Sequence, residues 1–288
     1  MYSNKHLYIF ITVIVISLCV PLWLVFVKSD SYKFTNYGLK FVGRRTWFGN
    51  TNITKKLRVG VLIPSTTRYL EISDIKKFSL IDTLFKSFYK TIQTEYNYTI
   101  YVGIDTNDKL KSYIHDIESF GDNIIVVRVN GSTFTKAVNT IAEKAVKDGV
   151  DYLMRINDDT QFITSNWTSL CIESLQNFDP PNIGVVGPLC PQDKQTILTQ
   201  DFVHVTHFHI FGFYYPPQLD NWWADDWITR VYESRSMRLT AWKVKHLVKA
   251  RRYRVNMHHE KLLPQFISQG NKTLTSYINR NIINITTS

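Results

Sequence analysis

The sequence lacks the glycine-rich loops that bind phosphate in several enzyme classes. No GxGxxG pattern and no P-loop follows any predicted strand, which argues against a dinucleotide-dependent dehydrogenase and against a P-loop NTPase. Internal repeats and low-complexity tracts are also missing. Acidic residues are fewer than basic ones, 24 against 34, so the formal net charge is +10. Such a balance favours anionic partners, namely phosphates, nucleotides, acidic lipids or glycans, without choosing among them.

Cysteine is scarce, with three residues in a chain of 288. Cys19 lies in a long apolar run, which leaves Cys171 and Cys190 for the rest of the chain. A disulfide between these two and a pair of buried free thiols are both compatible with the sequence, because sequence alone fixes no geometry.

Residues 7–27 form an apolar run without a charged side chain. As a helix this run would span ~30 Å, which is enough to cross a bilayer. A cleaved signal peptide is the alternative, but its apolar region usually has only ~7–15 residues and ends in a small-residue cleavage site, which this run does not offer. We therefore predict a transmembrane signal anchor at 7–27, between a cytosolic tail at 1–6 and a stem at 28–56.

Asparagine sequons of the N-x-Ser/Thr type occur throughout the chain after this run. They begin at Asn52, Asn97, Asn130, Asn166, Asn271 and Asn284. Together they predict that the body of the protein lies in the lumen of the Golgi or endoplasmic reticulum, as in a single-pass type II membrane protein. No nucleic-acid-binding motif is present, so we expect no nucleic-acid partner.

Strand-like and helix-like apolar patterns alternate from residue 57 onward. Strands are predicted at 57–63, 98–104, 123–129, 152–156 and 183–187, and helices at 74–96, 109–120, 137–146, 167–178 and from 221. This alternation predicts an α/β domain at 57–288, with a mostly parallel sheet covered by helices on both faces.

Two stretches of the domain are interpreted from composition. Residues 202–215 are aromatic and β-rich, and the alternation of His204, His207 and His209 would place the three on one face of a strand. Such a face could serve a metal, although a half-buried strand face is more common. Residues 243–254 are strongly basic, which is typical of a solvated helix face and also compatible with a phosphate contact.

The predicted strand at 152–156 runs directly into Asn157, Asp158 and Asp159. Ligands of open α/β sheets collect at the carboxyl ends of the strands. Two adjacent carboxylates at such an edge repel each other unless a cation or solvent relieves them, and a hard divalent ion is a natural occupant. Asp-Asp-Thr is also a common turn composition, so the tripeptide alone fits a structural loop as well.

Residues 57–260 resemble the GT-A-fold glycosyltransferases, and family 2 in particular, which use nucleotide-diphosphate sugars. Asn157-Asp158-Asp159 resembles their Asp-x-Asp motif. The resemblance implies a Rossmann-like GT-A sheet, an Mn²⁺ or Mg²⁺ ligand at Asp159 and a sugar or ribose contact at Asp158. Ala224-Asp225-Asp226 resembles the x-Glu-Asp motif, which implies the catalytic base at Asp226 and an acceptor contact at Asp225.

The same resemblance implies which residues contact the donor. They come from the loop after the first strand, the end of the second strand and a Lys-Ala-Val-Asn run that is similar to the family's Lys-Ala-Arg-Asn. These residues are Pro64, Ser65, Thr66, Arg68, Asp105 and Asn139. His258 or His259 resembles the late histidine that completes the metal shell in many members.

Trp222, Trp223 and Trp227 flank the second acidic pair and suit an acceptor floor, since aromatic faces stack on sugar rings. Core packing would explain the tryptophans equally well, and Asp225 and Asp226 could simply be the negative charge that a helix N-terminus favours. The sequence thus predicts a metal-dependent, inverting glycosyltransferase of hexosyl or N-acetylhexosaminyl type that acts on a glycan or glycoprotein hydroxyl. A catalytically inactive carbohydrate-binding protein on the same scaffold and a metal-dependent phosphohydrolase are the alternatives.

Overall fold

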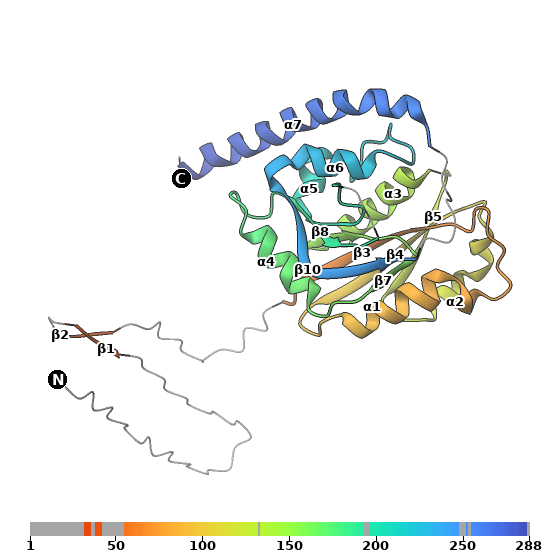
Figure 1. The fold of residues 1–288 in the computed structure, drawn as a ribbon, viewed down its shortest axis with the longest axis horizontal. Helices are drawn as coiled ribbons and strands as arrows, with labels where there is room; N and C mark the ends of the chain where they lie inside the picture. The colour runs from red at the N-terminus through yellow and green to blue at the C-terminus, as the bar shows by residue number, and fades with distance from the viewer. Residues whose placement is uncertain are drawn as a thin grey trace, which may run out of the picture. The chain divides into compact units, whose positions relative to one another are not determined.

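The computed structural model in Figure 1 describes residues 32–35, 38–41, 55–131, 133–192, 196–247, 252 and 255–286, with side chains described only between 55 and 280. The chain divides into two units, Met1–Thr54 and Lys55–Ser288. In the first unit, β1 (Tyr32–Thr35) pairs antiparallel with β2 (Gly38–Phe41). The predicted anchor at 7–27 lies outside the described residues. Within the described ranges, no helix combines the length and apolarity needed to cross a membrane.

The second unit is organised around a sheet with eight strands in its described part. The strands are β3 (Arg58–Ser65), β4 (Asn97–Asp105), β5 (Ile124–Val129), β6 (Tyr152–Arg155), β7 (Thr160–Phe162), β8 (Val185–Leu189), β9 (Asp201–His204) and β10 (Ser236–His246). Their order across the sheet is β5-β4-β3-β6-β9-β8-β10-β7. Only β9 and β7 run antiparallel to their neighbours among these strands, so the prediction of a mostly parallel α/β sheet is confirmed.

Helices cover both faces of this sheet, as predicted (Figure 1). They are α1 (Lys86–Thr91), α2 (Ile114–Glu118), α3 (Phe134–Lys147), α4 (Trp167–Gln176), α5 (Thr206–Phe211), α6 (Ala224–Tyr232) and α7 (Met257–Thr286). The single helix predicted at 74–96 is instead a 3-10 turn, a π-helical turn at Leu80–Phe85 and the short α1. The prediction for α3 is confirmed, including Gly149, whose φ of +78° just after the helix end is a conformation that glycine adopts readily.

Alternate residues of the central strands feed two separate hydrophobic cores. On β3, Val59, Val61 and Ile63 belong to the core beneath α1 and α4, whereas Leu62 belongs to the core beneath α3, α5, α6 and α7. Each fully buried apolar side chain of this kind stabilises the fold by about 1.5–3 kcal/mol. Because side chains fill both faces of the sheet, the strand ends are what remains for binding a ligand.

The histidine-rich segment at 202–215 is not the single strand that its alternation suggests. β9 ends at His204, and α5 follows at Thr206. His204 Nδ1 accepts from the backbone N–H of Thr206 at 3.2 Å, which turns the chain away from the sheet. His207 then packs in the second core between the Tyr232 hydroxyl and the Tyr214 carbonyl, at 2.9 and 2.8 Å, and burial lowers its pKa to about 4. The three histidines therefore do not share a strand face.

The basic stretch at 243–254 does not begin as the helix that its composition suggests. Its first part belongs to β10, which pairs in parallel with β8 and antiparallel with β7. Trp242 and Val244 point into the core, while Lys243 and Lys245 are exposed. This is the period of two that a half-buried strand requires, and the lysines occupy its outer face.

Both cysteines of the second unit are free thiols in the structure. Cys171 lies in the first core and Cys190 is also buried. Burial raises the pKa of the Cys171 thiol well above its ordinary value, so this side chain behaves as a small apolar residue.

Candidate functional site

The two neighbouring carboxylates lie where β6 leaves the centre of the sheet. Asp158 is 1% exposed and Asp159 is 6% exposed, so both acids are buried at the strand end. After them the chain turns, with the Thr160 N–H donating to the Asn157 carbonyl at 3.2 Å, and enters the edge strand β7. Buried carboxylates need donors or cations around them.

Asp158 is held by Arg252 and by the loop that follows β3 (residues 65–68, the first loop). The Ser65 hydroxyl at the end of β3 donates to it at 2.5 Å. Arg252 reaches both of its oxygens, with Nη1 to Oδ2 at 2.7 Å and Nη2 to Oδ1. Burial raises the pKa of Asp158, and the charge of Arg252 works against that increase. The carboxylate is therefore part of a paired, hydrogen-bonded cluster.

Asp159 has a histidine partner that the sequence analysis did not find. His246, the last residue of β10, lies with Nε2 at 2.9 Å from Asp159 Oδ1. The strand register produces this contact, since His246 pairs with Thr160 and the Leu247 N–H donates to the Asp159 carbonyl. Burial would raise the pKa of Asp159, but the hydrogen bond and charge of His246, together with Arg252, lower it overall.

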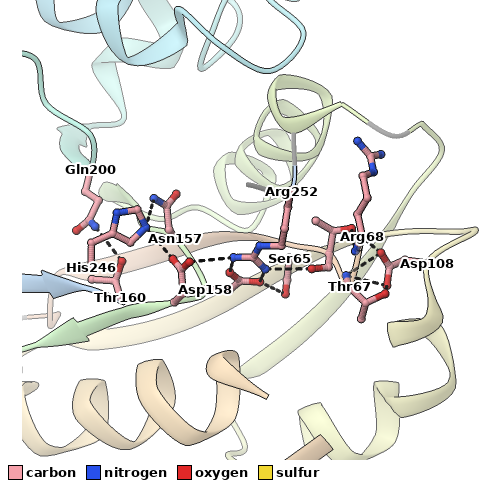
Figure 2. A network of polar contacts seen from close by, with 12 residues as sticks. Ser65, Thr67, Arg68, Asp108, Asn157, Asp158, Thr160, Gln200, His246 and Arg252 are labelled. Atoms are coloured by element: carbon pink, nitrogen blue, oxygen red, sulfur yellow. Dashed lines mark hydrogen bonds and ion pairs between the residues drawn. The ribbon is translucent and has the colours of Figure 1, made fainter. Parts of the chain in front are cut away.

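Figure 2 shows that this network crosses the ends of β6 and β3, from Gln200 and His246 on one side to Asp108 on the other. Arg252 lies between Asp158 and the first loop, and its Nη1 also donates to the Thr66 carbonyl at 3.0 Å. The predicted donor-binding residues Pro64, Ser65 and Thr66 therefore do lie beside the acidic pair.

Asp108 fixes the shape of the first loop. Its carboxylate accepts from the Thr66 hydroxyl at 2.5 Å and from the hydroxyl and N–H of Thr67 at 2.8 and 3.0 Å. The Arg68 N–H then donates to the Thr66 hydroxyl at 3.1 Å. Asp105, which was predicted to contact the nucleotide donor, ends β4 and accepts from the N–H of Asn107 at 2.8 Å. The sequence analysis did not identify Asp108. Its carboxylate holds Thr66 and Thr67 in place, so the first loop has a fixed conformation.

Asn139 lies in α3, and its side-chain amide forms hydrogen bonds with backbone groups. It donates to the Tyr215 carbonyl at 2.8 Å and accepts from the N–H groups of Tyr214 and Tyr215, both at 2.9 Å. These contacts anchor the chain after α5. The structure therefore places Asn139 in a structural clamp and does not bring it into the network around Asp158 and Asp159.

The two acids of the second motif begin α6 and point to different neighbours. Asp225 Oδ1 accepts from Nη2 of the buried Arg155 at 2.6 Å. Asp226 lies 3.2 Å from Arg230 Nη2, with its side chain 16% exposed. Burial raises the pKa of Asp226, Arg230 lowers it, and the charge of Glu260 adds to the increase. A raised pKa makes a carboxylate a better proton acceptor.

The tryptophans before α6 differ in their surroundings. Trp222 and Trp223 are both partly exposed, whereas Trp227 is only 1% exposed and packs in the second core. Trp223 has a φ of +74° at the helix N-cap, which turns the chain sharply into α6. Trp222 and Trp223 thus keep surface that a ligand can contact, whereas the prediction of an acceptor contact for Trp227 is wrong, because its side chain is buried in the core.

The late histidines lie at the start of α7. His258 is exposed, and His259 is buried with Nε2 at 3.7 Å from Asp220 Oδ2 and 3.2 Å from Asn256 Nδ2. The structure thus pairs the predicted ligand His259 with the loop before α6. The histidine in contact with Asp159 is His246.

A divalent ion would find two protein ligands at the strand ends. A carboxylate oxygen and an imidazole nitrogen are ligands that such ions accept, and Asp159 and His246 present this pair 2.9 Å apart. In the part of the chain that the structure describes, no cluster of three or more His, Cys, Asp and Glu residues could hold a metal. Within the described residues, the candidate ligand set at the strand ends is therefore this pair.

Comparisons with protein-family models and with curated proteins find no match. Solved structures do match. Residues 1–349 of S. aureus TarS, in complex with UDP-GlcNAc, are 11% identical, with 78% of this chain and 72% of that fragment covered and a TM-score of 0.54. The mannosyltransferase PcManGT from Pyrobaculum calidifontis, in complex with GDP-Man and Mn²⁺, is 12% identical, with 81% and 77% covered and a TM-score of 0.50.

A third solved structure, GalNAc-T7 with UDP, GalNAc and Mn²⁺, is 14% identical with a TM-score of 0.51. Here 70% of this chain is covered, and the chain spans 46% of the length of GalNAc-T7. These neighbours are GT-A-fold glycosyltransferases. At such low identity the likeness establishes the architecture, and this chain has the GT-A fold.

Proposed function

We propose that the protein is a glycosyltransferase that moves a sugar from a nucleoside-diphosphate donor to a hydroxyl of a glycan or glycoprotein. The observation that carries the proposal is the buried pair Asp158–Asp159 at the carboxyl end of β6, contacted by His246 and Arg252, in a GT-A fold. The neighbours that bind UDP-GlcNAc and GDP-Man support the choice of donor class.

Each part of the network has a role in this reaction. The loop at Ser65 and Thr66, shaped by Asp108, receives the nucleotide together with Asp105, and Asp158 meets the ribose or sugar hydroxyls. Arg252 and the excess of basic residues favour the anionic diphosphate. Asp159 and His246 would hold Mn²⁺ or Mg²⁺, which neutralises the diphosphate as it leaves. The presence of Mn²⁺ in two of the neighbouring structures supports such an ion.

The acceptor side begins at α6. Asp226 takes the proton of the acceptor hydroxyl while the acceptor oxygen bonds to the anomeric carbon and the sugar–phosphate bond breaks, its electron pair leaving with the diphosphate. One displacement of this kind inverts the anomeric configuration. Trp222, Trp223 and Asp225 would line the acceptor.

A donor screen tests the proposal. The purified full-length chain is incubated with a panel of UDP- and GDP-sugars, with Mn²⁺ or with chelator, and with glycan acceptors, and released nucleotide and glycosylated product are both measured. We expect one donor to give product only with the metal present. Nucleotide release without any glycosylated product would favour the phosphohydrolase alternative. Saturable glycan binding without turnover would favour the carbohydrate-binding alternative.

We also propose a single-pass type II topology, with the anchor at 7–27 and the GT-A unit in the lumen of the Golgi or endoplasmic reticulum. Asn97 and Asn166 are exposed in the structure, so both sequons can accept a glycan. Expressed in a eukaryotic cell, the protein should stay in the membrane after alkaline extraction, and an endoglycosidase should increase its mobility. A secreted product that starts near Lys28 would show that the apolar run is a cleaved signal peptide.

A further inference from the structure

Arg155 is a buried charge in the middle of the sheet, and its guanidinium touches both sides of the proposed site. Arg155 is the last residue of β6, and it is 0% exposed. Burial lowers the pKa of Arg155, but the nearby tyrosine hydroxyls and carboxylates raise it more strongly, so the group stays ionised. The ring centroids of Phe134 and Tyr215 lie 5.5 and 5.7 Å from the guanidinium carbon.

All five N–H donors of this guanidinium have an acceptor. Nε donates to the Tyr215 hydroxyl at 2.7 Å. Nη1 donates to the Thr199 carbonyl at 2.6 Å and to Asn157 Oδ1 at 3.3 Å. Nη2 donates to Asp201 at 2.9 Å and to Asp225 at 2.6 Å. A planar group held at five points has no freedom to rotate, so whatever it contacts is held at a fixed spacing.

One of the two carboxylates already neutralises Arg155. Asp201 is fully buried and accepts from Arg155, from the Tyr214 hydroxyl at 2.5 Å and from the Tyr215 hydroxyl at 2.6 Å. Asp225, in contrast, has a side chain that is 31% exposed and comes from the first turn of α6. The charge of Asp225 also favours the ionised guanidinium, and because Asp225 belongs to α6, the same contact ties this helix to β6.

The consequence is a rigid connection between two halves of the site. Asn157 opens the run that contains Asp158 and Asp159, and Asp225 is the neighbour of Asp226. Arg155 donates to Asn157 through Nη1 and to Asp225 through Nη2. A shift of α6 relative to the end of β6 would have to break one of these contacts.

We propose that Arg155 positions the catalytic side of the site. This inference rests on the proposed function. Arg155 fixes the first turn of α6 against the end of β6 and so sets the position of Asp226 relative to a donor bound at Asp158 and Asp159. Misplacing a reacting group by 1 Å can cost about 100-fold in rate. Loss of the Arg155–Asp225 contact should therefore lower the turnover number while leaving donor binding unchanged.

The test compares Asp225→Ala with Tyr214→Phe in the full-length chain. Each variant removes one hydrogen-bond partner from the same network, but only the first removes the connection to α6. With the donor selected in the screen and with Mn²⁺, we expect Asp225→Ala to lower kcat by about 10–100-fold with an unchanged donor KM and an unchanged Kd for UDP or GDP. Tyr214→Phe should lower the melting temperature and leave kcat near that of the wild type. Asp225→Asn, whose amide oxygen can still accept from Arg155, should recover part of the loss.

A double-mutant cycle with Arg155→Lys separates positioning from a direct role of Asp225. If Asp225 acts through Arg155, then Asp225→Ala should cost little further in kcat once lysine is present. Additive losses of kcat in the double mutant would overturn the proposal. A wild-type kcat in Asp225→Ala would also overturn it, and this single variant can be measured even if Arg155→Lys does not fold. An inactive wild type would remove the proposed function and this inference together, whereas an active wild type with an active Asp225→Ala removes only the inference.

Discussion

Replacing Asp226 by Asn should lower sugar transfer by about 10²–10⁴-fold, the usual contribution of a positioned general base. The substitution is nearly isosteric, but the amide cannot take the acceptor proton at neutral pH. Asp226 is in the first turn of α6 and pairs with Arg230, whereas Asp158 and Asp159 contact Ser65, Arg252 and His246. The affinities for nucleotide and metal should therefore stay unchanged, which calorimetry on the same preparation can measure.

The pH profile gives an independent check on the same residue. A base works in its deprotonated form, and burial raises the pKa of Asp226 above its ordinary value. Transfer by the wild type should therefore fall as the pH drops through this raised pKa, and the Asp226→Asn variant should lose that acidic limb. Asp225→Asn is the matched control and should cost less. An Asp226→Asn variant as active as the wild type would contradict the assignment, and a product that retains the donor's anomeric configuration would argue against a base mechanism.

Replacing Asp159 by Ala should abolish metal-dependent binding of the donor while the fold survives. Asp159 presents one oxygen to His246 and lies at the strand end where the diphosphate would arrive. The measurement is donor binding with Mn²⁺ and with chelator, alongside the melting curve of each protein. Wild-type binding that ignores the chelator, or full activity in the variant, would remove this ion site.

The same titration identifies the second ligand. His246→Ala should raise the Mn²⁺ concentration needed for half-maximal donor binding, because the structure places His246 at 2.9 Å from Asp159. His259→Ala is the comparison, since His259 contacts Asp220 at 3.7 Å in the structure. A larger change in the His259 variant would restore the assignment made from the sequence.

Regular periodicity explains which parts of the fold could be predicted. The central strands and α3 carry unbroken apolar patterns, and the structure places them close to the predicted bounds. β10 was missed because its lysines suggest a basic helix. The alternation of Trp242, Val244 and His246 was the available signal for a strand with a histidine at its carboxyl end.

The site was predicted where chain neighbours form it and missed where distant segments meet. Asp158 and Asp159 follow a recognisable buried strand, so their place at the sheet edge could be inferred. Arg252 lies 94 positions from Asp158 in the sequence, and nothing local links the two. Arg155 did carry a signal, because a charged side chain inside an apolar strand requires buried partners. Those partners, Asp201 and Asp225, come from β9 and α6 and follow from tertiary packing alone.

Arg252, which pairs with the two acids, would make folding independent of the proposed metal ion. In many metalloproteins the ligand charges are uncompensated without the ion, so removing the ion unfolds the domain. Here the folded chain supplies its own counter-ion, because Arg252 pairs with Asp158 and also reaches Asp159. The proposed cation would have to compete with this guanidinium for Oδ2 of Asp159. The ion is most strongly favoured when a diphosphate arrives with it, since the phosphates can bind Arg252 and release the carboxylate.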